Sequence, residues 1–486
     1  MTLARRADES DPVLPYAASD LLGGLPPASA VTLETRYGNG DLTAVLDALG
    51  VGGPFRVESP WELRDERGRH LVHAAGYAAL PFGEAYPPLV EFVAAFLQRN
   101  RELSLPQQSA SAWRGALEAN LVTLLGSFAP SHKDSRVLFG NSGAEAVEAA
   151  IKLARAARPR AGTFVNFGSA YHGKTHGALA LTPNEEYQAP FLPLSPRTIT
   201  LPYGDLEAVE KTLVRHARDI VAVVVEPVQG EGGVISPPPG FLAGLGEVAG
   251  RHGVLVIADE IQTGLGRTGE WFASVAAGLD PDIITLAKPL GGGLVPVGAA
   301  IARAEIVKAL LPGFASKRHS STFAGGSLAM AVALRSLELI RQEGLVRKAR
   351  EDGAYALEKL RSVQRRYPNF LQEVRGAGML FGLQVRPVIG QLPLGTRRLL
   401  PYDDDTLNQL AAALAMRALH LGGVHACVSL NNVRTIRLTP ALNLPRPLLD
   451  ELLTRTEAVA ARHRRAWTML PRLPLPRLVR LMRLSD

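Results

Sequence analysis

Four short, very apolar segments restrict the fold of this chain more than any other feature of its sequence. They are Thr163-Phe-Val-Asn, Val221-Ala-Val-Val-Val, Val254-Leu-Val-Ile-Ala and Ile283-Ile-Thr-Leu-Ala. Strands with so few polar residues are buried on both faces, which is typical of a parallel sheet covered by helices. Helical periodicity accompanies them, because apolar residues recur on one face of the segment from Ala144 to Ala157. The pattern predicts an α/β fold with a mostly parallel sheet.

The sequence divides into segments of different character. A strand-turn-strand is expected from Trp61 to His73, and one long helical stretch from Leu328 to about Gln364. The predicted segments are an N-terminal arm (1–60), a hairpin segment (61–109), a large α/β domain (110–340), a smaller α+β segment (341–461) and a basic tail (462–486).

The charge distribution argues against a nucleic-acid partner. The formal charge is +7, but the tail from Arg462 to Asp486 holds seven arginines and one acid, so +6 of this charge lies there. The rest of the chain is almost neutral and shows no nucleic-acid-binding motif. The tail is interpreted as a segment lying on its own protein; binding to an acidic partner or a membrane surface is the alternative.

Other classes of protein are excluded by what the sequence lacks. The apolar run from Leu328 to Leu334 is among the longest, far short of the ~20 residues that a transmembrane helix needs. The segment from Met1 to Pro27 has no continuous apolar stretch, so no signal peptide is predicted and a cytoplasmic location is expected. The single cysteine, Cys427, cannot form an internal disulfide or a cysteine-based zinc site, and no metal site is predicted.

One glycine motif resembles a dinucleotide fingerprint. Gly264-Leu-Gly-Arg-Thr-Gly269 matches G-x-G-x-x-G, but five residues separate it from the preceding strand. No acid follows at positions 284–292, where the motif requires one. We therefore reject dinucleotide binding.

Three other segments carry groups suited to one ligand. Ser142 follows a strand and opens a helix, where backbone N–H groups and the helix dipole attract an anion; an ordinary N-cap is the alternative. Asp259 and Gln262 follow a buried strand, where a carboxylate needs a cationic partner; an N-cap is again the alternative. Lys288 ends the next strand beside three glycines, and buried lysines of lowered pKa form Schiff bases; a lysine reaching to solvent is the alternative.

A phosphate, a ring nitrogen that pairs with a carboxylate, and a carbonyl that condenses with an amine together describe pyridoxal phosphate (PLP). Tyr171 and His172 supply flat side chains after a further strand, suited to stacking on such a ring. The combination predicts a PLP site more specifically than any of its parts.

At this point the motifs resemble a known family, the class III (ω-amino) aminotransferases of PLP fold type I, over roughly residues 60–455. The matching segments are Asn141-Ser-Gly-Ala-Glu-Ala, Tyr171-His-Gly, Glu226-Pro-Val-Gln-Gly-Glu231, Asp259-Glu-Ile-Gln262, Ala287-Lys288, His319-Ser-Ser-Thr322 and Ile436-Arg437-Leu. The resemblance implies a large domain with a mostly parallel seven-stranded sheet sandwiched by helices. It also implies a small α+β domain built from both chain ends, here residues 61–109 and 341–461.

The resemblance also implies roles for the cofactor site. Lys288 is the Schiff-base lysine and proton shuttle, and Asp259 pairs with the pyridine nitrogen. The remaining cofactor-binding residues are Ser142, Gly143 and Ala144 at the phosphate, Tyr171 and His172 at the ring, Gln262 at the phenolic oxygen, and Thr322 at the phosphate of the neighbouring subunit. A homodimer with shared active sites follows from the last of these.

For the substrate, the resemblance implies that Arg437 grips a carboxylate and that Glu231 neutralises it when no carboxylate is present; a permanent ion pair is the alternative. Other substrate-binding candidates are Glu226, Tyr77 and Lys174. Among putrescine and ornithine-type members, the putrescine branch is the most similar, because Lys174 stands where many members acting on ornithine-type substrates have an arginine. Two departures are Gly83-Glu84 in place of the family's Gly-His and Thr322-Phe-Ala-Gly-Gly in place of Thr-Phe-Gly-Gly-Asn.

The predicted activity is PLP-dependent transfer of the terminal amino group of a diamine or ω-amino acid to 2-oxoglutarate. Three alternatives remain open. They are an acetylornithine or 4-aminobutyrate type of aminotransferase, an amino-acid racemase or epimerase on the same scaffold, and a non-catalytic PLP-binding or membrane-associated protein.

Overall fold

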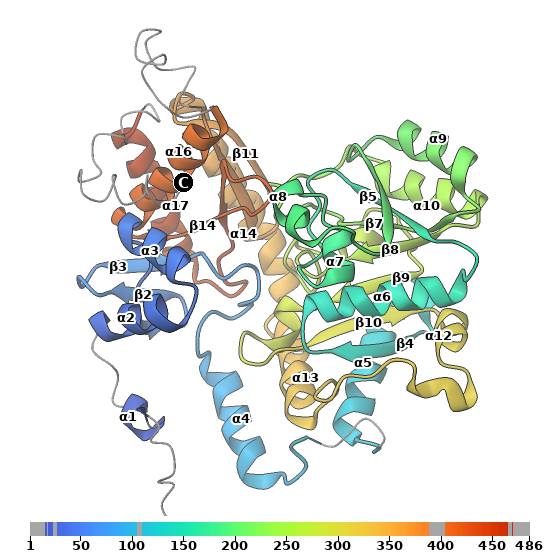
Figure 1. Ribbon diagram of the computed structural model, residues 1–486. Helices are drawn as coiled ribbons and strands as arrows, with labels where there is room; N and C mark the ends of the chain where they lie inside the picture. Colours follow the sequence, from blue (N-terminus) through green and yellow to red (C-terminus); the bar gives the residue numbers. More distant parts are fainter. Residues whose placement is uncertain are drawn as a thin grey trace, which may run out of the picture.

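The computed structural model describes residues 15–16, 18–22, 27–104, 109–387, 404–464 and 469. Figure 1 shows the described segments from the N-terminal region, blue, and from the C-terminal region, red, lying side by side, with the central sheet and its helices beside them. These segments lie together because a strand near residue 424 pairs with the N-terminal hairpin.

The largest sheet has seven strands. Their order is β4 (Arg136–Gly140), β10 (Gly298–Ala302), β9 (Ile283–Leu286), β8 (Leu255–Asp259), β7 (Ile220–Val225), β5 (Thr163–Phe167) and β6 (Arg197–Leu201). Only β10 runs antiparallel to its neighbours; the strands from β9 to β6 are parallel. The predicted fold class, with its mostly parallel seven-stranded sheet, is confirmed.

Helices cover both faces of this sheet. In chain order, the helices of this part of the chain are α5 (Ala112–Phe128), α6 (Gly143–Ala157), α7 (His176–Ala180), α8 (Glu185–Gln188), α9 (Leu206–His216), α10 (Phe241–Arg251), α11 (Ala273–Ala276), α12 (Ala304–Leu310) and α13 (Ser327–Gln342). All six residues of β7 are buried, with Val224 in the apolar cluster of α6 and Val223 in the cluster of α5, α10 and α13. Burial on two sides explains why these strands contain almost no polar residues.

Two four-stranded sheets form the smaller part. One has the order β1 (Phe55–Ser59), β2 (Glu62–Asp65), β3 (His70–His73), β13 (Val424–His425); the other has β11 (Leu371–Ala377), β12 (Leu380–Val385), β15 (Thr435–Leu438), β14 (Cys427–Val428). The expected strand-turn-strand is the β2–β3 hairpin. The parallel pairing of β13 with β3 shows that both chain ends build this part.

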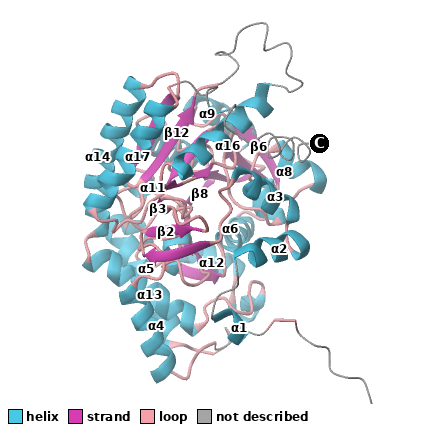
Figure 2. Cartoon of the chain, turned by 90° about the vertical axis from the view of Figure 1, so that its left-hand side faces the viewer, coloured by secondary structure: helices cyan, strands magenta, loops and turns pink. Residues whose placement is uncertain are grey.

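The remaining helices pack around these sheets (Figure 2). They are α1 (Ala18–Leu22), α2 (Pro27–Tyr37), α3 (Gly40–Leu49), α4 (Pro87–Arg99), α14 (Leu345–Arg366), α16 (Asp404–Leu421) and α17 (Arg446–Arg462). The described residues also form short 3₁₀ helices: η1 (Pro130–His132), η2 (Ala189–Phe191), η3 (Lys288–Gly291) and η4 (Gly313–Lys317). Every helix in the described ranges is too short or too polar to cross a membrane.

Two expectations differ from the structure. The single helical stretch from Leu328 to about Gln364 is two helices, α13 and α14, because Gly344 adopts a left-handed φ of +62° between them. The arm predicted for residues 1–60 contains α2, α3 and β1, and β1 pairs with the hairpin strand β2. Residues 1–14 of that arm, and most of the basic tail (465–468 and 470–486), lie outside the described residues.

Candidate active site

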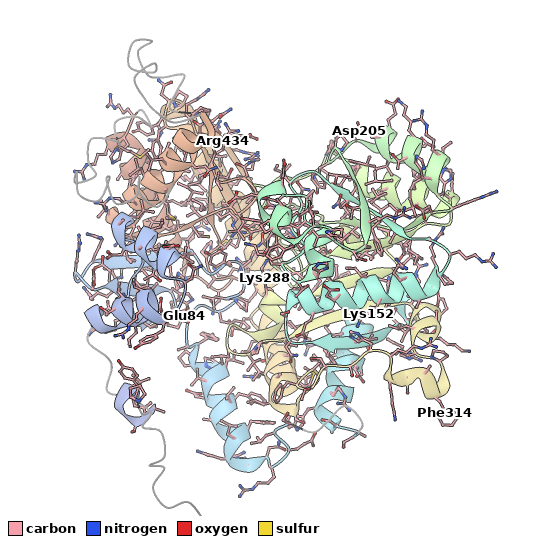
Figure 3. All side chains as sticks on the ribbon, in the orientation of Figure 1. Glu84, Lys152, Asp205, Lys288, Phe314 and Arg434 are labelled. Atoms are coloured by element: carbon pink, nitrogen blue, oxygen red, sulfur yellow. The ribbon has the colours of Figure 1, made fainter. Side chains whose placement is uncertain are left out.

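A cavity of about 530 Å³ lies where the carboxyl ends of the central strands meet the smaller part of the molecule. Figure 3 places Lys288 at this junction, near the centre of the molecule. The lining includes Asn141, Ser142, Gly143, Ala144, Tyr171, His172, Lys174, Glu226, Glu231, Asp259, Ile261, Gln262 and Lys288, together with Ala79, Leu80 and the segment 293–297. Eleven of the fourteen predicted site residues therefore surround one cavity.

The first turn of α6 forms one wall. Ser142 is the N-cap of this helix, and its hydroxyl accepts a hydrogen bond from Glu145 N at 3.1 Å. Because the hydroxyl acts there as an acceptor, its own proton is free to be donated to a ligand. The dipole of a 15-residue helix adds favourable potential for an anion beside Gly143 and Ala144.

This turn is packed too closely against β10 for any side chain at position 298. A Cβ atom on Gly298 would lie 2.1 Å from the carbonyl oxygen of Ser142. We expect Gly298→Ala to displace the turn at a cost of about 1–3 kcal/mol, typical of overpacking, and so to weaken PLP binding roughly 10- to 100-fold. PLP titration of the apo-protein measures this. Gly250→Ala is the control, since no atom lies within 4 Å of its added Cβ; equal affinities in both variants would contradict the prediction.

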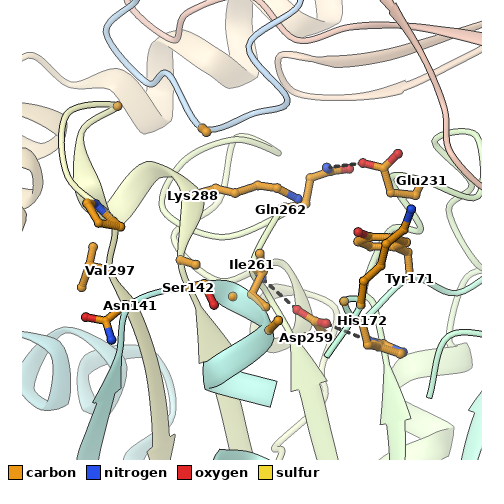
Figure 4. A pocket seen from close by; sticks show the side chains of 18 of the residues that line it. Asn141, Ser142, Tyr171, His172, Glu231, Asp259, Ile261, Gln262, Lys288 and Val297 are labelled. Atoms are coloured by element: carbon orange, nitrogen blue, oxygen red, sulfur yellow. Dashed lines mark hydrogen bonds and ion pairs between the residues drawn. The ribbon is translucent and has the colours of Figure 1, made fainter. Parts of the chain in front are cut away.

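Asp259 lies at the end of β8, below Lys288 (Figure 4). Its Oδ1 accepts from Ile261 N and from the Thr285 hydroxyl, each at 3.1 Å, and its Oδ2 lies 2.7 Å from His172 Nδ1. Burial lowers the pKa of His172, but the hydrogen bond and charge of Asp259 outweigh this and raise the pKa above its ordinary value. His172 thus donates to Asp259 and holds that carboxylate in place.

Lys288 extends into the cavity from the residue after β9 and Ala287 (Figure 4). Its backbone has a φ of +23°, which is unusual for a non-glycine residue and marks a strained position. Burial lowers the pKa of Lys288, and the charge of Arg437 adds to this effect. Its amine is therefore more readily neutral, and more nucleophilic, than an exposed lysine.

Glu231 and Arg437 form a buried ion pair at the cavity's upper wall. Arg437 Nη1 donates to Glu231 Oε1 and also to Gln262 Oε1 at 3.2 Å. Glu231 Oε2 accepts from Leu430 N at 3.0 Å. Burial opposes ionisation of both partners, but their mutual attraction lowers the pKa of Glu231 and raises that of Arg437. The pair is fully charged in this arrangement.

Arg437 retains unused donors. Its Nε has no hydrogen-bond partner in the described part of the chain, and its Nη2 contacts only Cys427 Sγ, at 3.8 Å. The guanidinium lies 5.5 Å from the centroid of the Tyr77 ring. Neither Arg437 nor Tyr77 lines the cavity directly, whereas Glu231, the partner of Arg437, does line it.

Glu226 lies under the Tyr171 segment. Its carboxyl group accepts from Tyr171 N at 2.9 Å and from Gly230 N at 3.3 Å. Burial raises the pKa of Glu226 to about 7. Both contacts are with backbone groups, so this side chain positions the Tyr171 segment; its predicted contact with substrate stays a prediction.

The comparisons with known proteins agree with this geometry. The model of the family "Aminotransferase class-III" matches residues 60–459. The chain belongs to the class-III aminotransferase family. Aminotransferase PigE of a Serratia species is 37% identical over 386 residues, which cover 77% of this chain and 44% of PigE. The chain therefore spans less than half the length of this curated relative.

Solved structures of the same family superimpose over most of the chain. Ornithine aminotransferase of Toxoplasma gondii gives a TM-score of 0.77 at 26% identity, covering 91% of this chain and 97% of its own. A PLP-bound amine transaminase from an uncultivated Pseudomonas species gives 0.73 at 28% identity, covering 84% and 94%. The recognition of the class-III aminotransferase family and of its fold from the sequence is confirmed.

As a class-III aminotransferase the chain uses PLP, and the cavity's groups fit that cofactor. The start of α6 offers donors for a phosphate, and buried Asp259 offers a carboxylate that can accept from a ring N–H. Lys288 offers an amine of lowered pKa for an aldehyde. Bound PLP supplies a carbonyl that condenses with amines and a ring that withdraws electrons from the carbon being deprotonated.

Two predicted residues need separate mention. Thr322 is exposed and lies outside the cavity of its own chain, next to the exposed Phe323. Lys174 lines the cavity, and its Nζ lies 3.9 Å from the centroid of the Tyr187 ring. Ala79 and Leu80, which line the cavity, lie in the segment from Tyr77 to Glu84, for which a place at the donor pocket is expected from the family resemblance. The lining segment 293–297 was not among the predicted site residues, and only the nearby glycine run pointed to it.

Proposed function

We propose that this transaminase moves the terminal amino group of a diamine or ω-amino acid to 2-oxoglutarate, which yields an aldehyde and glutamate. The Glu231–Arg437 pair at the cavity wall carries the proposal. The two substrates differ in whether a carboxylate lies beside the reacting carbon, and this pair is suited to both situations.

When the donor has no carboxylate next to its amino group, the pair stays closed. Arg437 is fully buried, and an unpaired guanidinium there would be costly. Glu231 neutralises it, so an uncharged alkyl chain meets no net charge at this wall.

When 2-oxoglutarate enters, the guanidinium has donors to offer. Nε has no partner among the described residues, and Nη2 has only a weak sulfur contact. Two such donors suit the bidentate grip of a carboxylate. Gln262, which contacts both members of the pair, can hold Glu231 as Arg437 turns to the substrate.

The remaining side chains perform the proton chemistry that both half-reactions share. Lys288 Nζ accepts a proton from the substrate carbon and returns one, which a neutral amine within the cavity can do. Asp259, supported by His172 and Thr285, holds the proton on the ring nitrogen of the cofactor. Tyr171 offers a flat ring at the same cavity.

We further propose a homodimer in which the exposed Thr322 reaches the cofactor phosphate of the partner subunit, and a cytoplasmic location. Exposure of Thr322 and Phe323 beside each other supports the first part. Resemblance to ornithine aminotransferase supports a donor of the ornithine or diamine class, and Lys174 distinguishes this chain from members with an arginine there. The donors to compare for glutamate formation are putrescine, cadaverine, ornithine, 4-aminobutyrate, lysine and β-alanine.

The acceptor assignment can be tested by removing the ion pair. Arg437→Met combined with Glu231→Gln leaves no unpaired buried charge, so the loss reflects the missing carboxylate grip. We expect the KM for the keto-acid acceptor to rise about 100-fold, as for a lost buried charge contact, while the first half-reaction with the amine donor changes less than about threefold. Stopped-flow measurement of each half-reaction separates the two.

The matched control is Arg375→Met. Arg375 lies in β11 of the same sheet and donates to Gln384 at 3.0 Å, outside the cavity. An unchanged KM for the keto acid in the double variant, or equal losses in both half-reactions, would show that Arg437 is not the acceptor site.

A further inference from the structure

The glycine motif that was rejected as a dinucleotide site has another position in the structure. The turn Gly264–Gly269 begins two residues after Gln262, and it is held open by positive φ angles at Leu265 (55°), Gly266 (95°) and Gly269 (85°). Its central residue, Arg267, is completely buried, with 0% of its surface exposed.

Arg267 joins this turn to two strands of the smaller part. A single nitrogen, Nη1, donates to Met379 O at 2.9 Å and to Pro440 O at 2.6 Å. Met379 immediately precedes β12, and Pro440 follows β15 by two residues. These strands are antiparallel neighbours, so the guanidinium bridges their adjacent ends.

The contact continues along the backbone. Met379 N donates to Arg267 O at 2.9 Å. Gly378, with a φ of +53°, lies so close that an added Cβ would be 2.4 Å from the carbonyl carbon of Thr268. The turn and the β11–β12 connection are therefore in direct backbone contact, which leaves little freedom for one to move against the other.

Arg267 has no acidic partner within the described ranges. Both hydrogen bonds of its side chain go to carbonyl oxygens, and Nε and Nη2 have no partner among the same residues. Burial lowers its pKa to about 9. A buried cation without a counter-charge is unfavourable for stability, so this residue is better explained by the strands that it positions than by the stability that it adds.

Strands β12 and β15 lie at the proposed acceptor site. Arg437 lies in β15, opposite Gly382 of β12, and contacts Gln262, which lies just before the turn. Arg267 thus connects, through a few covalent and hydrogen bonds, the backbone of Arg437 with the segment that contains Gln262 and Asp259.

We propose that Arg267 is a positioning residue that fixes β15 against the Gln262 segment and thereby sets the affinity of Arg437 for the acceptor's carboxylate. The inference rests on the proposed function of Arg437. It assigns to the glycine motif a role in joining the two parts of the active site, rather than in binding a nucleotide.

The test compares Arg267→Met with Arg267→Lys and with a control. Methionine fills the space without donors, whereas lysine keeps a charge and can reach one or both carbonyls. Arg350→Met is the control, because Arg350 donates from α14 to the same turn, at Gly269 O (2.9 Å), but contacts neither β12 nor β15 among the described residues.

Two measurements are needed on the PLP-loaded proteins. Calorimetry gives the Kd of glutarate, a dicarboxylate that cannot react, and stopped-flow kinetics give the two half-reactions. For Arg267→Met we expect the Kd of glutarate and the KM for the keto-acid acceptor to rise at least about tenfold, since small misplacements of binding groups have effects of this size. The rate with the amine donor changes less than about threefold, Arg267→Lys recovers part of the loss, and Arg350→Met resembles the parent.

Other outcomes overturn the proposal. If Arg267→Met binds glutarate with the same Kd as the parent, Arg267 does not set the affinity for the acceptor. If it loses rate equally in both half-reactions, Arg267 has only a general structural role. If Arg267→Met does not fold, the same comparison is made with Arg267→Lys, whose unchanged KM and Kd would also refute it. The Arg437 variants distinguish failure of the proposed function from failure of the positioning role. If the Arg437 variants lose acceptor binding and the Arg267 variants do not, only the positioning role of Arg267 is refuted.

Discussion

Replacement of Lys288 by alanine is expected to abolish transamination. Lys288 lines the cavity with an amine of lowered pKa, and the proposed function assigns to it the movement of the proton on the substrate carbon. Loss of a positioned general base lowers rates by about 10²–10⁴-fold, and loss of the covalent attachment point adds to this. The measurement is glutamate formation in a coupled assay, with folding checked by circular dichroism.

A second substitution separates the amine's chemistry from its charge. Lys288→Arg retains a cation, but a guanidinium stays protonated and is neither a nucleophile nor a base at neutral pH. We expect it to be as inactive as Lys288→Ala. Borohydride reduction followed by mass spectrometry should locate a pyridoxyl group at residue 288 of the parent and at no lysine of either variant.

The control for both is Lys152→Ala. Lys152 is exposed on α6, the helix that Ser142 caps (Figure 3), and it does not line the cavity. Its variant should match the parent in rate. Appreciable turnover by Lys288→Ala, within about tenfold of Lys152→Ala, is incompatible with the assigned role.

The sequence predicts the central sheet well because its signals are local. The β7 and β8 strands are apolar on both sides, and each is followed by turn residues, so a few consecutive residues are enough to predict where each strand lies. The same patterns place Ser142, Asp259 and Lys288 after strands, and strand ends of a parallel sheet meet at one edge. Convergence of these three on one cavity needed no information beyond the pattern.

Features that depend on distant contacts could not be found in this way. His172 and Asp259 are 87 residues apart, and nothing near either residue indicates their hydrogen bond. The pairing of Glu231 with Arg437, 206 residues away, was expected only from the family resemblance. Arg267 looked like part of a glycine motif, and its contacts with Met379 and Pro440 are a property of the assembled fold.

The predicted boundaries of helices were wrong where a single residue or a weak pattern determines where a helix ends. Both α13 and α14 have helical periodicity, so the break at Gly344 was hidden within one long apolar pattern. In the N-terminal region, the large aliphatic residues of α2 are only Val31 and Leu33, so this helix gave little periodic signal. Its neighbour α3 is amphipathic but only ten residues long.

Asp259 provides the second test of large expected effect. Its carboxylate is buried and receives three hydrogen bonds, from Ile261 N, the Thr285 hydroxyl and His172. These three partners satisfy the buried carboxylate and fix its orientation. A carboxylate in this position can pair with a protonated ring nitrogen, and a protonated ring is the stronger electron sink.

Asp259→Asn removes the charge while it keeps nearly the same shape. We expect kcat to fall about 10²–10³-fold, the size of effect seen when a preorganised electrostatic contact is lost, with a smaller loss of PLP affinity. Stopped-flow rates at saturating PLP separate the two effects.

The control for this substitution is Glu260→Gln. Glu260 is the next residue, is equally buried, and accepts hydrogen bonds from Thr263 and Ser274 outside the cavity. We expect this control to lower the free energy of unfolding but to keep kcat per bound PLP within about threefold of the parent. Equal kcat values in the two variants would mean that the cofactor's ring does not depend on the charge at position 259, and that the carboxylate held by His172 serves only the packing of the cavity floor.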